Sequence, residues 1–336
     1  MSDISERKQA HLDLCLEPNS QGSGNLFSEY KLPYRALPEI NLADVSTETE
    51  LFKKRLSQPL IIASMTGGVA HAQTINTNLA IAAEACGVAM GVGSQRIALE
   101  KDEARETFEL VRKHAPTAVI FANMGAIQLN YGRTVDDYRR VVDMIGADAL
   151  YLHINPLQEA IQPGGDTNYA GLLDKIADVV AKVGVPVFAK EVGHGLDVVT
   201  AKALIERGVK GVDCAGTSGT SWAWVEAKRA GDSAFESWFK EYGLRSNTLL
   251  EQYRELPQDI YKVVSGGVRT PIEAVKARAL GANFYSFAQP FLAPALEGPE
   301  AVAAFIRHFQ RGIAITLFTA GCKNWEAAAQ LPLQKK

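Results

Sequence analysis

Apolar runs alternate along the chain with segments of helical spacing, and each run ends in a short polar or glycine-rich motif. The pattern predicts eight strands: PLIIAS from residue 59, VAMGV from 88, AVIFA from 118, ALYL from 149, PVFA from 186, GVDC from 211, IYKVV from 260 and NFYSF from 283. Helical spacing predicts helices at roughly 72–86, 102–114, 134–145, 169–183, 197–207 and 271–280. Strands that alternate with helices form parallel βαβ units, and eight such units close into a (β/α)₈ TIM barrel, with its chemistry on the loops after the strands.

The chain divides at the first predicted strand. Residues 1–58 form an N-terminal arm, with a short helix expected at 4–15 and a flexible break at 21–25. Residues 59–336 form the barrel as a single domain. The C-terminal stretch 298–330 is expected to be a long helical segment.

One long insert, residues 218–246, follows the sixth predicted strand and carries three of the four tryptophans. An aromatic loop of this length on the catalytic face is typical of a lid or an interface between subunits. A satellite hydrophobic cluster is an equally good interpretation.

Composition excludes several classes of protein. The chain has 336 residues, 47% of them hydrophobic, a net charge of −3 and a pI of about 6.1, so it has no overall basic field for nucleic acid or a membrane surface. No apolar run approaches the roughly 20 residues that span a bilayer. The charged N-terminus does not resemble a secretory signal, and the four cysteines are isolated. We therefore expect a cytoplasmic protein with reduced thiols.

Two motifs at the end of the barrel predict a phosphate site. Ser265-Gly266-Gly267 follows the seventh strand and precedes a helix, and Ala288-Gln289-Pro290 follows the eighth. Glycines allow backbone N–H groups to converge on an anion, and barrels commonly bind phosphate between these two loops. The ligand would be a phosphorylated cofactor or a sugar phosphate.

Lys190 ends an apolar strand, where an unpaired cation would be costly to desolvate. A Schiff base, a carboxylate partner or an electron-rich cofactor ring would each explain it. Glu191 points to the other face of the strand and is not the obvious partner. The backbone of Met65-Thr66-Gly67-Gly68 and the side chains of Ser94 and Asn123 would suit a flavin, which an aldolase would not need.

The motif His153-Ile154-Asn155-Pro156-Leu157-Gln158-Glu159 after the fourth strand is the stretch richest in candidate chemistry. Glu159 either binds Mg²⁺ beside a phosphorylated substrate or merely starts the next helix. Gln158 cannot act as a base but can orient a reacting carbon. His153 could act as acid, base or phosphate ligand.

Cationic side chains far apart in the sequence predict a second anion site. Arg7, Lys8 and His11 lie on the N-terminal helix, and Gln95-Arg96 follow the second strand. Taken alone, such residues on a helix most often form a face that is simply exposed to solvent. A diphosphate would suit the combined set, since arginine is the preferred bidentate partner of phosphate.

The motifs RKxxH, MTGG, GSQR, HxNxxQE, KEVGxG, DxAGxxGTSW and SGGVR, in this order and spacing, resemble type 2 isopentenyl-diphosphate isomerase from about residue 7 to 323. The resemblance implies an FMN-binding barrel that interconverts isopentenyl and dimethylallyl diphosphate. It also implies reduction of the FMN, typically by NADPH, a requirement for Mg²⁺, and a homotetramer or larger assembly.

The resemblance also assigns roles. It implies that the substrate is held by Arg7, Lys8, His11, Ser94, Gln95, Arg96, His153, Asn155 and Gln158, with Gln158 and His153 nearest the chemistry and Glu159 on Mg²⁺. It implies that FMN is held by Met65, Thr66, Gly67, Ser94, Asn123, Lys190, Thr220, Gly266, Gly267, Ala288 and Gln289.

The chain departs from the family pattern at two places. Ala10 precedes His11 where a glutamate is common, and Thr217-Ser218-Gly219 stands where a Gly-Gly pair is usual. The candidate loops hold no pair of carboxylates placed for proton transfer, which fits a reaction in which the reduced flavin is acid and base. Two alternatives stay open. An FMN-dependent 2-hydroxy-acid oxidase or dehydrogenase would want a catalytic histidine and an arginine after strand six, and a flavin-binding scaffold would not need the loop at 153–159.

Overall fold

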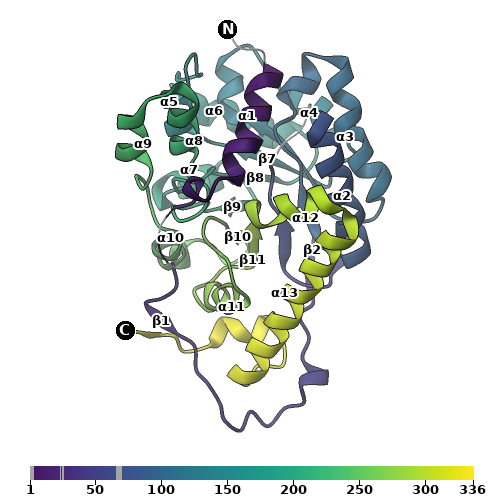
Figure 1. The fold of residues 1–336 in the computed structure, drawn as a ribbon, viewed down its shortest axis with the longest axis vertical. Coiled ribbons are helices and arrows are strands. Elements are labelled where there is room, and N and C mark those ends of the chain that lie inside the picture. Colours follow the sequence, from purple (N-terminus) through teal and green to yellow (C-terminus); the bar gives the residue numbers. More distant parts are fainter. Residues whose placement is uncertain (1–3, 23, 25, 66–69) are drawn as a thin grey trace.

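The computed structural model describes residues 4–22, 24, 26–65 and 70–336. Its centre is a closed barrel of parallel strands in the order β10-β11-β4-β5-β6-β7-β8-β9 (Figure 1). The barrel strands are β4 (Leu60–Ile62), β5 (Ala89–Gly91), β6 (Ile120–Gly125), β7 (Ala149–His153), β8 (Val187–Lys190), β9 (Gly211–Asp213), β10 (Tyr261–Val264) and β11 (Phe284–Phe287). Each overlaps a predicted run, with β6, β7 and β8 continuing into the polar motif that follows it, so the prediction of a (β/α)₈ barrel is confirmed.

Side chains that point into the barrel change from aromatic to polar toward the carboxyl ends of the strands. Phe121 stacks on Tyr151 at 4.4 Å between ring centroids, and Phe188 packs edge-on against Phe121. Two residues further along β7 and β8 come His153 and Lys190, which are register partners. The apolar layer therefore forms a floor beneath a polar carboxyl end.

Helices alternate with these strands close to the predicted positions, with ends that differ by about three residues or fewer. They are α2 (Ala70–Cys86), α3 (Asp102–His114), α4 (Val135–Met144), α6 (Leu172–Lys182), α7 (Val198–Glu206) and α11 (Pro271–Ala279). Two short helices, α5 (Pro156–Ile161) and α12 (Leu292–Glu297), and the 3₁₀ turns η3 (Gln95–Leu99), η4 (Ala126–Asn130) and η6 (Gln289–Phe291) follow strands. No helix in the described ranges has the length and apolar character that a bilayer crossing requires.

The C-terminal segment is shorter in its helical part than predicted. Helix α13 (Pro299–Ala320) ends where Gly321 adopts φ 76°, a left-handed conformation that stops a helix. A 3₁₀ turn, η7 (Glu326–Gln330), and strand β12 (Gln334–Lys335) follow. The expectation of one helical segment over 298–330 was therefore wrong beyond Ala320.

The N-terminal arm covers both ends of the barrel. Helix α1 (Ile4–Leu16) lies over the carboxyl end, beside α8 (Figure 1). A hairpin of β2 (Thr49–Leu51) and β3 (Lys54–Leu56) plugs the amino end, where Phe52 packs edge-on against Phe188 at 5.7 Å. A 3₁₀ turn, η1 (Pro18–Ser20), follows α1, and strand β1 (Tyr30–Lys31) pairs with β12, which joins the C-terminal strand to the arm.

The expected flexible break at 21–25 is not borne out at its first two residues. The Gly22 N–H donates to the carbonyl of Gly219 at 2.7 Å, and Gln21 Nε2 donates to Thr220 Oγ1 at 3.1 Å. A side chain at Gly22 would lie 2.7 Å from Ser218 Cα, so glycine is required by this close approach. Ser23 and Asn25 lie outside the described residues.

The aromatic insert forms two helices, α8 (Trp222–Ala230) and α9 (Ser233–Phe239), followed by α10 (Ser246–Gln252). Phe235 and Phe239 of α9 pack edge-on at 5.3 Å, next to a small buried cluster that includes Ala223 and Ile161. The satellite-cluster interpretation therefore holds for α9. Trp222, at the start of α8, faces the barrel mouth instead.

Candidate active site

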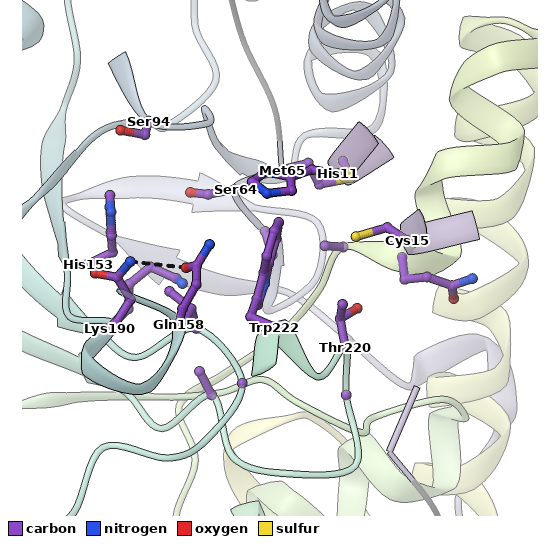
Figure 2. A pocket seen from close by; sticks show the side chains of 18 of the residues that line it. His11, Cys15, Ser64, Met65, Ser94, His153, Gln158, Lys190, Thr220 and Trp222 are labelled. Atoms are coloured by element: carbon purple, nitrogen blue, oxygen red, sulfur yellow. Dashed lines mark hydrogen bonds between the residues drawn. The ribbon is translucent and has the colours of Figure 1, made fainter. Parts of the chain in front are cut away.

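A cavity of about 260 Å³ opens at the carboxyl ends of the barrel strands, beneath α1. Figure 2 shows His153, Gln158 and Lys190 grouped on one side, Trp222 beside Gln158, and Ser64 and Met65 opposite. The predicted site residues that line it are Arg7, Lys8, His11, Met65, Ser94, Arg96, Asn123, His153, Asn155, Gln158, Glu159, Lys190, Thr220, Gly266, Gly267, Ala288 and Gln289. Thr66 and Gly67 lie outside the described residues.

Gln95 is not brought to the cavity with the others. Its side chain is fully buried behind the wall, where Nε2 donates to the carbonyl of Val141 at 2.9 Å and Oε1 accepts from the Asn123 N–H at 3.0 Å. Asn123 in turn faces the cavity. Gln95 therefore supports Asn123 rather than contacting a ligand in this arrangement.

Lys190 is a buried cation among buried carboxylates. Burial lowers its pKa, while the negative charges of Asp213 and Glu191 act in the opposite direction. Asp213 is the register partner of Lys190 on β9 and accepts a hydrogen bond from Ser265 Oγ at 2.6 Å. Sequence reasoning missed Asp213, although its position at the end of β9 was a usable signal.

Glu191 is not the side-chain partner of Lys190, as predicted from strand alternation. Its carboxylate accepts hydrogen bonds from the backbone N–H groups of Gly193, at 2.6 Å, and of His194 and Gly195. Lys190 Nζ instead donates to the backbone carbonyl of Glu191 at 2.7 Å. These bonds fix the ammonium group at the cavity wall.

His153 is neutral at pH 7. Burial and then the nearby charges of Lys190 and Lys8 lower its pKa to about 3. Nδ1 lies 2.8 Å from Asn123 Oδ1, and Asn123 Nδ2 donates to the carbonyl of Val92 at 3.0 Å. The Asn123 oxygen is therefore an acceptor and Nδ1 of His153 the donor, which leaves Nε2 as a hydrogen-bond acceptor and argues against His153 as an acid.

The glycines after β10 form a backbone cradle. Gly266 and Gly267 have φ of 77° and 106°, which side-chain-bearing residues rarely adopt. A Cβ on Gly266 would lie 2.0 Å from the carbonyl oxygen of Gly216, and one on Gly267 would lie 2.4 Å from Leu26 Cδ1. Only glycine fits, and the exposed backbone of this loop could hold a phosphate.

Cationic side chains from the N-terminal arm and from the loop after β5 also line this cavity. Lys8 Nζ donates to the Ser94 carbonyl at 3.3 Å and lies 5.8 Å from the centre of the Phe108 ring. Burial, with the charge of Arg7 adding to it, lowers the pKa of Lys8 to about 7. An anion bound here would favour the charged form of Lys8.

Glu226 organises the wall formed by α1 and α8, and sequence reasoning missed it. Its fully buried carboxylate lies 2.9 Å from His11 Nε2 and from Arg229 Nε, and accepts from Gln158 Nε2 at 3.0 Å. Trp222 also packs edge-on against His11, at 5.1 Å. Glu226 lies four residues after Trp222 on the same helix face, and that spacing could have revealed it.

Glu159 lies in the first turn of helix α5, and its carboxylate accepts hydrogen bonds from neutral donors, while its role as a Mg²⁺ ligand stays a prediction. Oε1 accepts from Asn155 Nδ2 and Oε2 from the Asp166 N–H, at 3.0 and 2.8 Å. Burial, opposed by these hydrogen bonds, raises its pKa. Within the described ranges no three His, Cys, Asp or Glu side chains gather in a metal-binding cluster.

Solved structures of mandelate oxidase have a similar fold. Mandelate oxidase with (S)-4-hydroxymandelic acid has a TM-score of 0.62 and 16% identity, with 100% of this chain and 99% of the other covered. A mandelate oxidase variant with benzaldehyde has a TM-score of 0.65 and 18% identity over the same shares. At such low identity the likeness establishes the fold alone.

Sequence comparisons are more specific. A family model described as FMN-dependent dehydrogenase matches residues 163–335. Proteins named isopentenyl-diphosphate delta-isomerase from Ignicoccus hospitalis and a Nostoc species are 41% and 42% identical, over 95% of this chain and 90% and 92% of theirs. One from Deinococcus radiodurans is 40% identical over 96% of this chain and 95% of its own. The chain therefore belongs to the isopentenyl-diphosphate delta-isomerase family of enzymes, on the barrel of the FMN-dependent dehydrogenases.

Proposed function

We propose that the protein interconverts isopentenyl diphosphate and dimethylallyl diphosphate, with FMN in its reduced form and Mg²⁺ bound to Glu159. The observation that carries the proposal is that one cavity has two separate sets of anion-binding groups. Glycine backbone after β10 suits the phosphate of a flavin, whereas Arg7, Lys8 and Arg96 suit a diphosphate. NADPH as reductant, a homotetramer or larger assembly and a cytoplasmic location stay predictions from the family resemblance.

The residues present fit FMN. The backbone cradle of Gly266 and Gly267 has no room for a side chain, and Lys190 offers a buried positive charge to an electron-rich ring. The buried hydroxyl of Ser64 lines the cavity and has no hydrogen-bond partner within the part of the chain that the structure describes, so a ligand could supply one. Reduced FMN supplies a ring nitrogen, N5, that can give and take a proton.

The residues present also fit Mg²⁺. This ion binds proteins through one or two carboxylates together with substrate phosphates and water. Glu159 offers one carboxylate, which is held in place by hydrogen bonds from neutral donors. Burial raises the pKa of this carboxylate, because its negative charge is costly to bury. A bound cation would neutralise that charge. The diphosphate would supply the other ligands.

The chain's own side chains have distinct tasks in this proposal. Arg7, Lys8 and Arg96 hold the diphosphate, and the Gln158 amide orients the reacting carbons. Glu226 fixes that amide, since Gln158 Nε2 donates to it at 3.0 Å. Trp222 closes the wall beside it and excludes water.

The rival function, oxidation of 2-hydroxy acids, has in its favour the fold and the match of residues 163–335 to the FMN-dependent dehydrogenase family. Such an enzyme would want a histidine and an arginine after the sixth barrel strand, and the loop 215–221 after β9 contains neither. His194, after β8, is committed to backbone groups: Nδ1 lies 2.7 Å from the Tyr242 carbonyl and Nε2 accepts from the Ala223 N–H. The geometry therefore favours the isomerase.

A paired assay tests the proposal. FMN-loaded protein is incubated without oxygen with NADPH, Mg²⁺ and isopentenyl diphosphate, and oxidised protein is separately offered a panel of 2-hydroxy acids. We expect dimethylallyl diphosphate in the first reaction and no bleaching of the flavin in the second. Glu159→Gln should retain FMN but lose isomerisation. Bleaching by a 2-hydroxy acid without any isomerisation would contradict the proposal.

A further inference from the structure

Asp166, behind the cavity wall, contacts three side chains that line the cavity, two through its carboxylate and one through its backbone N–H. Its Oδ2 accepts from Arg96 Nη1 at 2.9 Å and from Gln128 Nε2 at 2.8 Å. Its backbone N–H donates to Glu159 Oε2 at 2.8 Å. Arg96, Gln128 and Glu159 follow three neighbouring strands, β5, β6 and β7. Asp166 is thus the point at which three separate loops are tied together.

The chain reaches this point through a turn that depends on glycine. Gly164 has φ 72°, and the Gly165 N–H donates to the carbonyl of Gln162 at 2.9 Å. A Cβ on Gly165 would lie 2.0 Å from the carbonyl oxygen of Glu159. The turn therefore folds the chain tightly back onto α5, and this contact presents the Asp166 N–H to the Glu159 carboxylate.

Arg96 and Glu159 carry opposite charges and face one cavity, so without a ligand they could pair with each other. The structure prevents this pairing. The guanidinium of Arg96 is engaged by Asp166 and, through Nε at 3.1 Å, by Glu100. Glu159 accepts instead from the neutral Asn155 amide and the Asp166 backbone. Both charges are held in place while Glu159 stays available to a cation.

We propose that Asp166 is a positioning residue that holds Arg96 away from Glu159, so that both groups remain available to a Mg²⁺-bound diphosphate. The inference rests on the proposed function, because it takes Glu159 as the Mg²⁺ ligand. Without the Asp166 carboxylate, Arg96 would turn to Glu159 and compete with Mg²⁺.

Asp166→Asn tests the inference, because it keeps the shape of the side chain and removes its charge. Binding of inorganic pyrophosphate to the FMN-loaded protein is measured by calorimetry over a series of Mg²⁺ concentrations. We expect the half-saturating Mg²⁺ concentration to rise about tenfold, as is usual when a group that orients a metal ligand is lost. The FMN absorbance spectrum should not change. If the Asp166→Asn protein does not fold, the same measurements are made on Asp166→Ser.

Asp148→Asn is the matched control. Asp148 is similarly buried, with 19% of its side chain exposed against 16% for Asp166. It binds Lys54 at 2.6 Å and Arg112 at 2.9 Å, just before β7 and so at the opposite end of the barrel. Its loss should lower the melting temperature and leave the Mg²⁺ requirement as in the wild type.

A double-mutant cycle separates positioning from simple loss of charge. In an Arg96→Gln background the Arg96 guanidinium is no longer there to pair with Glu159, so Asp166→Asn should change the Mg²⁺ requirement by less than about twofold. A tenfold rise in that background, or none in the wild-type background, would overturn the inference. Wild-type protein that binds no pyrophosphate at any Mg²⁺ concentration would overturn the proposed function and the inference together.

Discussion

Replacing Glu226 by glutamine is expected to destabilise the protein at neutral pH, by an amount that shrinks in acid. The carboxylate is fully buried and is contacted by His11, Gln158 and Arg229. Burial alone would raise its pKa, but the contacts with His11, Gln158 and Arg229 outweigh burial and lower the pKa to about 2. The ionised form is therefore bound more tightly in the folded protein than in the unfolded chain.

The magnitude follows from linkage. A carboxylate with a lowered pKa in the folded state stabilises the fold above its unfolded-state pKa, and at about 1.4 kcal/mol per pH unit the contribution is roughly 3 kcal/mol. This stability is fully present above the ordinary glutamate pKa of 4.5 and is lost as the pH falls through about 2. Glutamine resembles the protonated acid, so the unfolding free energies of the wild type and of Glu226→Gln should approach each other as the pH falls from 4.5 toward 2.

Urea unfolding of both proteins from pH 7 to pH 3.5, roughly one unit below the unfolded-state pKa, measures the difference. The difference in unfolding free energy should be constant down to about pH 4.5 and then decrease by about 1.4 kcal/mol per unit. Glu206→Gln, at an exposed position with 72% of the side chain accessible, is the control and should show no difference. A difference in unfolding free energy for Glu226→Gln that does not change with pH would show that the fold does not lower the pKa of Glu226.

Four further predictions concern single positions. Gln158→Ala should lower turnover about a hundredfold with the bound-flavin spectrum unchanged, because the reacting carbons lose their orientation; unchanged turnover would remove its assigned role. Gly266→Ala should purify with little FMN, since its Cβ would lie 2.0 Å from the Gly216 carbonyl; normal FMN content by absorbance would refute the cradle. Ser218→Gly should raise stability by about 1 kcal/mol in thermal melts, because Ser218 has φ 88° where glycine is favoured; a lower melting temperature would contradict this. The KM for the diphosphate should rise above pH 7 as Lys8 loses its proton, given its pKa of about 7, and Lys8→Met should flatten the profile; a wild-type KM independent of pH would exclude Lys8 from binding.

The sequence was sufficient for the barrel and for most of the cavity because each buried strand ends where the side chains change from apolar to polar. His153 and Lys190 follow this rule, and their positions on neighbouring strands make them register partners. Parallel strands place such residues at one end, so their proximity needs no knowledge of the loops.

Positions set by the loops could not be predicted in this way. Ser94, Gln95 and Arg96 are consecutive polar residues, but a 3₁₀ turn begins at Gln95 and sends successive side chains in different directions. Gln95 consequently points into the protein. Asp166 approaches Arg96 only because a turn after α5 reverses the chain, and nothing in the periodicity of the sequence reveals that contact.

Isomerisation that depends on reduced flavin is tested by following the alkene protons of isopentenyl diphosphate by NMR, without oxygen, in the presence of FMN-loaded protein and Mg²⁺. The same sample is recorded with oxidised flavin and then after reduction with NADPH. Dimethylallyl diphosphate should form only after reduction. Bound, fully reduced flavin with no conversion would contradict this prediction, as would equal conversion in the oxidised sample.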